Sequence, residues 1–332
     1  MNPAKHLSAL IFAVLYASIS PQNADAQVDT PVASLADFCS KLPRPQWSAL
    51  KRLDIPAELT QDWFEVYDVT EGVIAIYEPF QWQEVISYLI LGSEKALLFD
   101  TGNGLGDIEL LVRSLTDKPI AVLNSHTHYD HVGGNFSFDV IYGMDTNYTR
   151  KNQQGVSNSE IGIEASGQAL CRDIPGDMTQ ETHVGQPFKI TEFIDDGTVI
   201  DLGDRQLEVL SIPGHTPDAI ALVDRNNGLM WTGDTYYSGP IWLYVPETDL
   251  EAYALSLERL ITEATNMRAL LPAHNTTWVD ASVLHRVKAG FQIMLKGGAR
   301  KVELGDGMAE YFVPAEDMFS FLMRDEPLPY TK

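Results

Sequence analysis

The sequence contains only two cysteines, Cys39 and Cys171, among its 332 residues. Two thiols exclude a disulfide-rich scaffold, and neither cysteine lies beside a histidine motif, so neither is a candidate metal ligand. In an oxidising compartment the two could form one long-range disulfide, and two unpaired buried thiols are the alternative. The length is sufficient for one large domain or two medium ones with a sizeable core.

Basic residues are also scarce. The chain has 23 lysines and arginines against 46 aspartates and glutamates, which gives a formal net charge of −23. Nucleic acids and anionic membranes attract basic surfaces, so this balance argues against both as partners. The chain has neither a low-complexity tract nor a visible repeat, and its hydrophobic content of 45% is ordinary for a globular protein. We therefore expect a small-molecule substrate.

Long hydrophobic runs are absent except near the N-terminus. Lys5 and His6 precede a largely apolar run over residues 7–19, which is too short to cross a bilayer comfortably. The small-x-small pattern at 24–26, just before Gln27, is typical of a signal-peptidase site. We predict a signal peptide over residues 1–26, a periplasmic or secreted mature protein, and no membrane insertion after cleavage.

The rest of the chain divides by composition. Residues 27–62 are rich in proline and polar residues and predict an N-terminal extension. From residue 63 strand patterns begin, and we place a catalytic domain over 63–300. Within it, 142–196 has no strong strand pattern and is interpreted as an insertion or lid, with His183 on its surface. Residues 301–332 are expected to form a tail that packs on the domain.

The densest chemistry lies in residues 125–134, Ser-His-Thr-His-Tyr-Asp-His-Val-Gly-Gly. His126 and His128 are two positions apart, so in an extended segment their side chains point the same way and can share a metal ion. Asp130 and His131, on the turn just beyond, can reach a second ion. The two glycines at the end of the stretch let the backbone turn into a helix.

Other candidate metal-binding residues also lie at or just after the C-terminal end of a predicted strand. Binding sites of α/β proteins are usually found at this end of the strands. The full set of seven is His126, His128, Asp130, His131, His215, Asp234 and His274. Seven ligands suit two ions with about three protein ligands each and one shared carboxylate. Imidazole and carboxylate without thiolate fit Zn²⁺ best, with iron or manganese as alternatives.

Five short motifs carry a resemblance to a known family. They are Leu-Leu-Phe-Asp-Thr-Gly at 97–102, His-x-His-x-Asp-His at 126–131, Pro-Gly-His-Thr-Pro at 213–217, Thr-Gly-Asp at 232–234 and Pro-Ala-His at 272–274. Together they resemble the metallo-β-lactamase superfamily over roughly residues 63–300. The resemblance implies an α/β fold, an αββα sandwich of two mixed β-sheets flanked by helices.

The same resemblance implies how the ligands divide. It predicts one ion on His126, His128 and His215, a second on Asp130, His131 and His274, and Asp234 as the bridge. Asp130 would also orient the nucleophile or pass on its proton. Tyr237 matches the position of a carbonyl-polarising tyrosine in lactonase members of the family, and simple packing is the alternative for it. Asp100 would fix a ligand loop or a histidine N–H.

The implied activity is that of an exported dinuclear zinc hydrolase, in which a metal-bound hydroxide attacks an activated carbonyl. Zinc β-lactamases commonly have Cys or Ser where this chain has Asp234, so a lactone or another carboxylic ester is the first prediction. The aromatics Phe80 and Trp82 in a predicted flap, and the run 241–245, favour an apolar acyl portion; for the two aromatics, packing back onto the core is the alternative.

Alternatives remain open at this point. Export favours a β-lactamase, because such antibiotics act in that compartment. The residues from Gly233 to Tyr237, Pro246 and the stretch 258–260 also look like a mammalian acyl-CoA thioesterase branch, which makes a thioesterase a further alternative. A phosphodiesterase is another. A metal-binding partner protein without catalytic activity is the non-enzyme alternative.

Overall fold

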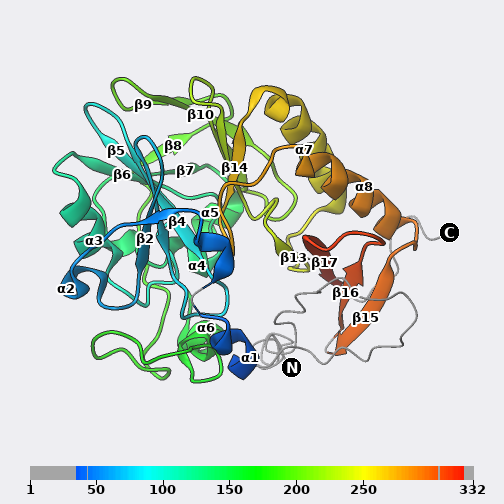
Figure 1. Ribbon diagram of the computed structural model, residues 1–332, viewed down its shortest axis with the longest axis horizontal. Helices are drawn as coiled ribbons and strands as arrows, with labels where there is room; N and C mark the ends of the chain where they lie inside the picture. Colours follow the sequence, from blue (N-terminus) through cyan, green and yellow to red (C-terminus); the bar gives the residue numbers. More distant parts are fainter. Residues whose placement is uncertain (1–34, 43, 306, 325–332) are drawn as a thin grey trace.

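The computed structural model describes residues 35–42, 44–305 and 307–324. The predicted signal peptide, the start of the N-terminal extension and the last residues of the tail lie outside the described residues. In Figure 1, α3 lies on the left, the sheets in the middle, and α7 and α8 on the right. No helix in the part of the chain that the structure describes is both long and apolar enough to cross a membrane.

The first sheet follows chain order: β1 (Lys51–Arg52), β2 (Glu65–Thr70), β3 (Val73–Tyr77), β4 (Ile86–Leu91), β5 (Ala96–Phe99), β6 (Ile120–Leu123), β7 (Ile141–Met144) and β8 (Glu192–Ile194). Neighbours are antiparallel from β1 to β5 and parallel from β5 to β8. Aliphatic and aromatic residues fill β3 and β4, which suits strands covered on both faces.

The second sheet has the order β14-β12-β11-β10-β9. Its strands are β9 (Val199–Asp201), β10 (Gln206–Ser211), β11 (Ile220–Asp224), β12 (Leu229–Gly233) and β14 (Ala269–Pro272). Only β12 and β14 run parallel among these pairs, so this sheet is also mixed. Buried side chains from both sheets, such as Phe99, Leu222 and Trp231, form one core between them.

Helix α3 (Ile108–Leu115) packs on the outer face of the first sheet, and α7 (Leu250–Glu263) and α8 (Val283–Leu295) pack on that of the second. The other helices of the described residues are α1 (Leu35–Ser40), α2 (Ala57–Thr60), α4 (Tyr129–Val132), α5 (Asn147–Asn152) and α6 (Asn158–Ile161). Leu111 of α3 packs with Leu98 outside the first sheet, and Leu257 of α7 belongs to the core outside the second. Asp107 caps α3 by accepting from the amide of Leu110 at 2.9 Å. The predicted sandwich of two mixed sheets between helices is confirmed.

A third sheet was not predicted. It has the order β13-β17-β16-β15, with β13 (Gly239–Leu243), β15 (Arg300–Gly305), β16 (Met308–Phe312) and β17 (Phe319–Arg324). Three of these strands come from the stretch that the sequence presented only as a tail. Phe319 and Phe321 share a core with Phe291 of α8. The C-terminal strands therefore hold β13, which carries Trp242, in place.

The predicted lid segment, residues 142–196, is more regular than its sequence indicates. It contains most of β7, all of β8, and the short helices α5 and α6. Helix ends at 165, and 166–171 form turns. Strands of three or four residues are too short to produce a periodic pattern, which is why the sequence did not reveal them.

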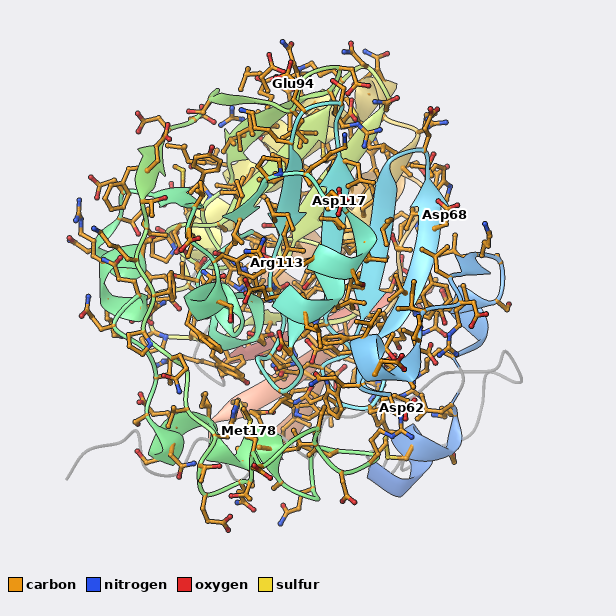
Figure 2. All side chains as sticks on the ribbon, turned by 90° about the vertical axis from the view of Figure 1, so that its left-hand side faces the viewer. Asp62, Asp68, Glu94, Arg113, Asp117 and Met178 are labelled. Carbon is orange, nitrogen blue, oxygen red and sulfur yellow. A yellow bond between two sulfur atoms is a disulfide. The ribbon has the colours of Figure 1, made fainter. Side chains whose placement is uncertain are left out.

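Charged side chains lie on the outside of this architecture. Figure 2 shows the exposed Asp68, Glu94 and Asp117 at separate places on one face; Arg113 lies in the last turn of α3, and Asp117 lies in the loop that follows that helix. Arg113 forms an exposed ion pair with Glu109 at 2.7 Å. Acidic groups spread in this way add solubility more than stability, because exposed ion pairs are worth little.

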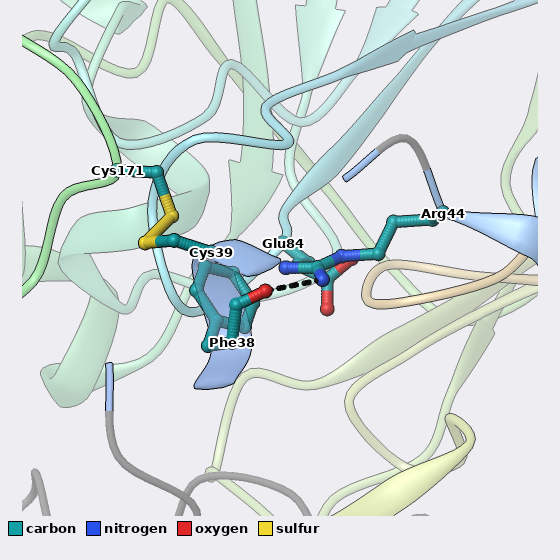
Figure 3. The surroundings of a disulfide bond; sticks show 5 residues. All are labelled: Phe38, Cys39, Arg44, Glu84 and Cys171. Carbon is teal, nitrogen blue, oxygen red and sulfur yellow. Dashed lines mark hydrogen bonds and ion pairs between the residues drawn. A yellow bond between two sulfur atoms is a disulfide. The ribbon is translucent and has the colours of Figure 1, made fainter. Parts of the chain in front are cut away.

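The N-terminal extension is tied to the predicted lid segment by a Cys39–Cys171 disulfide, which joins positions 132 residues apart (Figure 3). Around it, the buried side chains of Phe38, Trp82 and Ala169 form a small apolar cluster. The sequence left the pairing of the two cysteines open, and the structure answers it. The extension is thus anchored to the main domain by a covalent bond and by packing.

Replacing both cysteines by serine is expected to lower the free energy of unfolding by about 2–4 kcal/mol, because the unfolded chain regains a long loop's entropy. Urea unfolding with and without reductant measures this. Reductant should destabilise the wild-type protein and leave the double serine variant unchanged. Equal stability of the oxidised and reduced wild type would contradict the prediction.

His183, expected at the surface, is instead buried, at 2% exposure, and this expectation was wrong. Within the described residues neither ring nitrogen has a hydrogen-bond partner. Burial lowers the pKa of His183 from 6.5 to about 4. The folded protein therefore keeps this imidazole neutral at a pH where the unfolded chain already binds a proton.

The sign of the pH effect follows from that difference. Above pH 6.5 the imidazole is neutral in both states and does not affect the free energy of unfolding. As the pH drops from 6.5 towards 4, only the unfolded chain binds the proton, so the free energy of unfolding falls by up to about 3 kcal/mol. Urea unfolding of the wild type and of His183→Phe at several pH values tests it. The loss between pH 6.5 and 4 should be smaller in the variant, and identical pH profiles would refute the prediction.

Candidate metal centre

All seven predicted ligands come together at one end of the two large sheets. His126 and His128 follow β6, Asp130 and His131 lie in α4, and His215 sits in the turn between β10 and β11. Asp234 follows β12 and His274 follows β14. The first sheet thus supplies four ligands and the second sheet three, so the site forms only when the sandwich closes.

Three imidazoles form the first ligand group. His126 Nε2 lies 2.9 Å from His128 Nδ1, and His215 Nε2 lies 3.1 Å from each of those two nitrogens. Burial lowers the pKa of His126 and His215, and lowers that of His128 to about 3. Neutral rings at these distances point their nitrogens at one shared position.

Asp130, His131 and His274 form the second ligand group. Asp130 Oδ2 lies 3.4 Å from His131 Nε2 and 3.6 Å from His274 Nε2. Although burial lowers it, the pKa of His131 is raised well above its ordinary value by the carboxylates of Asp130, Asp234 and Asp100. So many buried carboxylates around two rings favour a bound cation.

Asp234 lies between the groups and presents one oxygen to each. Its Oδ1 is 3.1 Å from His274 Nε2 and 3.4 Å from His131 Nε2, while Oδ2 is 3.6 Å from His215 Nε2 and 3.9 Å from His126 Nε2. This is the arrangement expected of a bridging carboxylate. The assignment of an ion to each group remains a prediction from the sequence.

The ring nitrogens that face away from the centre are fixed by hydrogen bonds. His215 Nδ1 lies 2.7 Å from the Trp242 carbonyl, and His274 Nδ1 lies 2.7 Å from the Gln83 carbonyl. A carbonyl can only accept, so each Nδ1 carries the proton and each Nε2 offers a lone pair to the centre. This is the tautomer that a metal ligand requires.

The donor set therefore fits metal ions. His131 Nε2 and Asp234 Oδ1 are buried and, within the described residues, have no hydrogen-bond partner. Their lone pairs face the same space as the converging nitrogens of the first group. Seven nitrogen and oxygen donors gathered in two groups, without thiolate, match the chemistry of divalent ions such as zinc.

Asp100 supports the centre from behind, in both of the ways that the sequence indicated. Its Oδ2 lies 3.0 Å from His131 Nδ1, and its Oδ1 accepts from the backbone amide of Ser125 at 2.7 Å. It adopts a left-handed backbone conformation with φ of 65°, which is uncommon for a residue other than glycine. One carboxylate thus fixes a ring of the second group and the start of the histidine stretch.

Gly133 was expected to free the backbone for a helix, but close packing is the reason for it. Its φ of −59° suits any residue, whereas an added Cβ would lie 2.3 Å from backbone atoms of Asn103 and Gly104. The loop after β5 therefore presses directly on α4. A larger residue here would push the ligand-bearing turn away from that loop.

A cavity of about 320 Å³ opens directly onto the centre. Its walls are mostly aromatic and aliphatic: Trp82, Tyr129, Tyr148, Val156, Ile161, Tyr237, Trp242, Tyr244 and Val245. Trp82 and Trp242 stack with ring centres 5.3 Å apart. Cavities of this size and lining suit a small organic ligand with an apolar part.

The two aromatic residues of the predicted flap lie in different environments. Trp82 lines the cavity, whereas Phe80 packs into the core outside the first sheet, under the guanidinium of Arg172. Tyr237 also lines the cavity, with its ring 4.9 Å from that of His274. Its hydroxyl donates to the Pro240 carbonyl, so its predicted role on a substrate carbonyl stays a prediction.

Sequence reasoning missed two polar residues at the site, Gln83 and Glu164. Gln83 Nε2 lies 3.2 Å from Asp130 Oδ2, and Glu164 is a buried carboxylate in the cavity wall. Both sit in stretches without a motif, so no local signal distinguished them from ordinary loop residues. Only the folded arrangement brings both of them to the site.

Comparisons with known proteins identify the family to which the chain belongs. The model of the metallo-beta-lactamase superfamily matches residues 82–281. The human acyl-coenzyme A thioesterase MBLAC2 is 28% identical over 246 residues, which cover 69% of this chain and 87% of that protein. A hydroxyacylglutathione hydrolase from Cyanothece sp. is 29% identical, over 46% of this chain and 50% of that enzyme.

Solved structures show the same fold. A metallo-beta-lactamase family protein from Thermus thermophilus, TTHA1429, covers 69% of this chain and 82% of its own, with a TM-score of 0.52 and 19% identity. The DIM-1 metallo-beta-lactamase covers 73% and 100%, with a TM-score of 0.52 and 15% identity. Since the family model spans more than half of the sequence, the chain belongs to the metallo-beta-lactamase superfamily and has the fold of its hydrolases.

Proposed function

We propose that this protein is a dinuclear metal hydrolase that cleaves carboxylic thioesters and esters with an apolar acyl portion. The observation that carries the proposal is the aromatic cavity that opens directly onto the seven-ligand centre. A centre of this type needs a carbonyl substrate within reach, and the cavity provides apolar walls on which an acyl group can lie.

The chain's own residues prepare the reaction in specific ways. The two histidines bonded to backbone carbonyls keep their metal-facing nitrogens unprotonated. Asp130 Oδ2, which accepts from Gln83 and faces His131 and His274, is placed to orient an attacking water beside the second group. Divalent ions held by the seven ligands lower the pKa of water and polarise carbonyl oxygens. The stacked Trp82 and Trp242 keep bulk water from the acyl side.

The cavity's charge favours a small neutral leaving group. Among the residues that line it, Lys151 is the one lysine or arginine, and its ammonium lies 3.3 Å from a carboxylate oxygen of Glu247. A carrier thiol with several phosphates would meet few free cations here. The named thioesterase relatives support thioester cleavage, and this lining supports a short uncharged thiol or alcohol over a phosphate-rich carrier.

The test is a substrate panel with the zinc-loaded protein. We would measure kcat/KM for acyl thioesters of a small neutral thiol with increasing chain length, for the matched oxygen esters, for acyl-CoA, for a cephalosporin and for a phosphodiester. We expect the neutral thioesters to be cleaved fastest and kcat/KM to rise with chain length until the cavity is full. Faster cleavage of the cephalosporin or the phosphodiester would overturn the proposal.

A matched pair of tryptophan variants ties the result to the cavity. Trp242→Ala should lower kcat/KM for a long acyl chain by about tenfold and for an acetyl group by much less, because buried aromatic contacts contribute at least a kcal/mol. Trp278 is 40% exposed and does not line the cavity, so Trp278→Ala should match the wild type.

Lactones, the first prediction from the sequence, form the second candidate substrate class. Tyr237 in the cavity wall is the observation that favours them, because a hydroxyl there can turn towards a substrate carbonyl. An acyl-homoserine lactone with the best acyl chain tests it. Tyr237→Phe should then slow the lactone about tenfold more than the thioester, and equal slowing would reject this role.

We further propose that the protein is exported. The N-terminal pattern over residues 1–26 supports this, and so does the Cys39–Cys171 disulfide, since disulfides persist in oxidising compartments. Export would also separate the enzyme from cytoplasmic acyl-CoA. N-terminal sequencing of protein recovered from its native host should find a start near Gln27, and an intact Met1 would refute it.

A further inference from the structure

Glu164 is a buried carboxylate to which the proposed reaction assigns no role. It comes from the predicted lid segment, just after α6, and is 2% exposed. Its Oε2 accepts from the Trp82 indole at 2.7 Å and from Gln81 Nε2 at 3.0 Å, and an interaction with the Tyr129 hydroxyl opposes the rise that burial gives to its pKa. Three polar side chains therefore surround Glu164.

One of those side chains leads onward to the metal centre. The Tyr129 hydroxyl lies 3.1 Å from Gln83 Nε2, and the same amide nitrogen lies 3.2 Å from Asp130 Oδ2. Asp130 Oδ2 is the atom that faces His131 and His274. Glu164 is therefore linked to a ligand of the second group through Gln83, whose side-chain amide donates to the Tyr129 hydroxyl and whose backbone amide donates to Gln81 Oε1 at 2.7 Å.

Gln83 also reaches that group by its backbone. Its carbonyl accepts from His274 Nδ1 at 2.7 Å, so Gln83 contacts two of the group's three ligands. The first group of three histidines has no described hydrogen bond to Gln83 or Glu164. The influence of this hydrogen-bond network should therefore fall on one ligand group and not on the other.

We infer that Glu164 is a positioning residue for the second ligand group, acting through Tyr129 and Gln83 on Asp130. The Asp130 carboxylate can rotate about its last side-chain torsion, and a Gln83 amide held in place beside it favours one orientation. Glu164 fixes the Tyr129 hydroxyl, which in turn fixes the Gln83 amide. This inference rests on the proposed dinuclear centre.

The same carboxylate anchors Trp82, so one group sets both the acyl wall and the geometry of Asp130. A role limited to Trp82 would alter the binding of long acyl chains and leave metal affinity unchanged. A role through the network would alter metal affinity even without a substrate. Metal binding is therefore the measurement that separates the two.

The experiment uses the mature protein, three single variants and one double variant of Tyr129 and Glu164, each stripped of metal and titrated with Zn²⁺ against a coloured chelator. Tyr129→Phe removes one hydroxyl from the network, and Glu164→Gln replaces one acceptor oxygen of Glu164 by an amide nitrogen at nearly the same shape. The control is Tyr148→Phe, which removes a hydroxyl from the same cavity wall. In its place, the hydroxyl of Tyr148 bonds to Asn152 and not to the network.

We expect two zinc ions per wild-type chain. Tyr129→Phe and Glu164→Gln should each weaken one of them about tenfold and leave the other unchanged, and Tyr148→Phe should match the wild type. The double variant should lose no more than either single variant, because both changes break one network. Tyr129→Phe alone keeps the test decisive if Glu164→Gln folds poorly.

Two results would count against the account in different ways. Wild-type affinity for both ions in Tyr129→Phe, or losses that simply add in the double variant, would overturn the role of Glu164 and leave the proposed function intact. A wild-type chain that binds fewer than two zinc ions would overturn the proposed dinuclear centre itself, and this inference with it.

Discussion

Asp234→Asn is expected to lose one metal ion per chain and to lower kcat/KM by at least about 10³-fold, or about 4 kcal/mol of transition-state stabilisation. Asp234 presents one oxygen to each ligand group, at 3.1 Å from His274 Nε2 and 3.6 Å from His215 Nε2. An amide of the same shape keeps one oxygen and places an NH₂ group, which cannot bind a cation, where the other oxygen was. The substitution therefore removes one of the two metal-binding oxygens of Asp234 without changing the volume of the side chain.

Metal analysis of the purified variant and its turnover of the best thioester measure the two effects together. Asp224→Asn is the matched control, because Asp224 is equally buried but pairs with Arg205 at 3.3 Å and belongs to neither ligand group. It should keep both ions whatever it costs in stability. Full activity of Asp234→Asn with both metals retained would contradict the bridging role.

Arg44→Met is expected to lower the free energy of unfolding by about 3–5 kcal/mol, the cost of leaving a buried charge without its partner. Arg44 is 6% exposed, and its Nε lies 2.9 Å from Glu84 Oε1 (Figure 3). Its Nη1 donates to the Phe38 carbonyl at 2.7 Å. Methionine retains much of the apolar stem, so the variant isolates the charge.

A second variant makes this test specific. Arg44→Met combined with Glu84→Gln should recover a large part of the lost stability, because the uncompensated carboxylate is then gone. Urea unfolding of both variants gives the comparison. A loss below about 1 kcal/mol in Arg44→Met, or a double variant no more stable than the single one, would contradict a stabilising role for the pair.

The pair matters because it supports the metal centre from the N-terminal extension. The backbone carbonyl of Glu84 accepts from the amide of Asn275, next to His274, at 3.1 Å. The indole of Trp47 donates to the Asn275 carbonyl at 3.1 Å. The extension thus braces the loop that carries one ligand, and changes there should reach the centre.

The ligand set was predictable because its residues are chemically distinctive and recur at strand ends. His126 and His128 have strand spacing, and Asp234 and His274 each end an apolar run that forms β12 or β14. The strand Val73–Tyr77 lies in the region where strand patterns were predicted to begin, because five aliphatic and aromatic residues after a turn are typical of a buried strand.

What the sequence did not reveal depends on distant pairing. The strands β15 to β17 have side chains like those of any amphipathic tail, and only their pairing with β13 makes them a sheet. Gln83 and Glu164 lie 81 positions apart and gain their role from Tyr129 between them. In the sequence, Arg44 resembles a surface residue, because its ion-pair partner Glu84 lies far from it along the chain.

The central claim is that seven side chains hold two catalytic ions, and metal restoration tests it most directly. The purified mature protein would be stripped with a chelator, titrated with Zn²⁺, and assayed at each step with the best neutral thioester. We predict that turnover is lost on stripping and returns fully as the bound zinc reaches two ions per chain. Turnover that survives stripping, or zinc binding that stops at one ion or none, would contradict the claim.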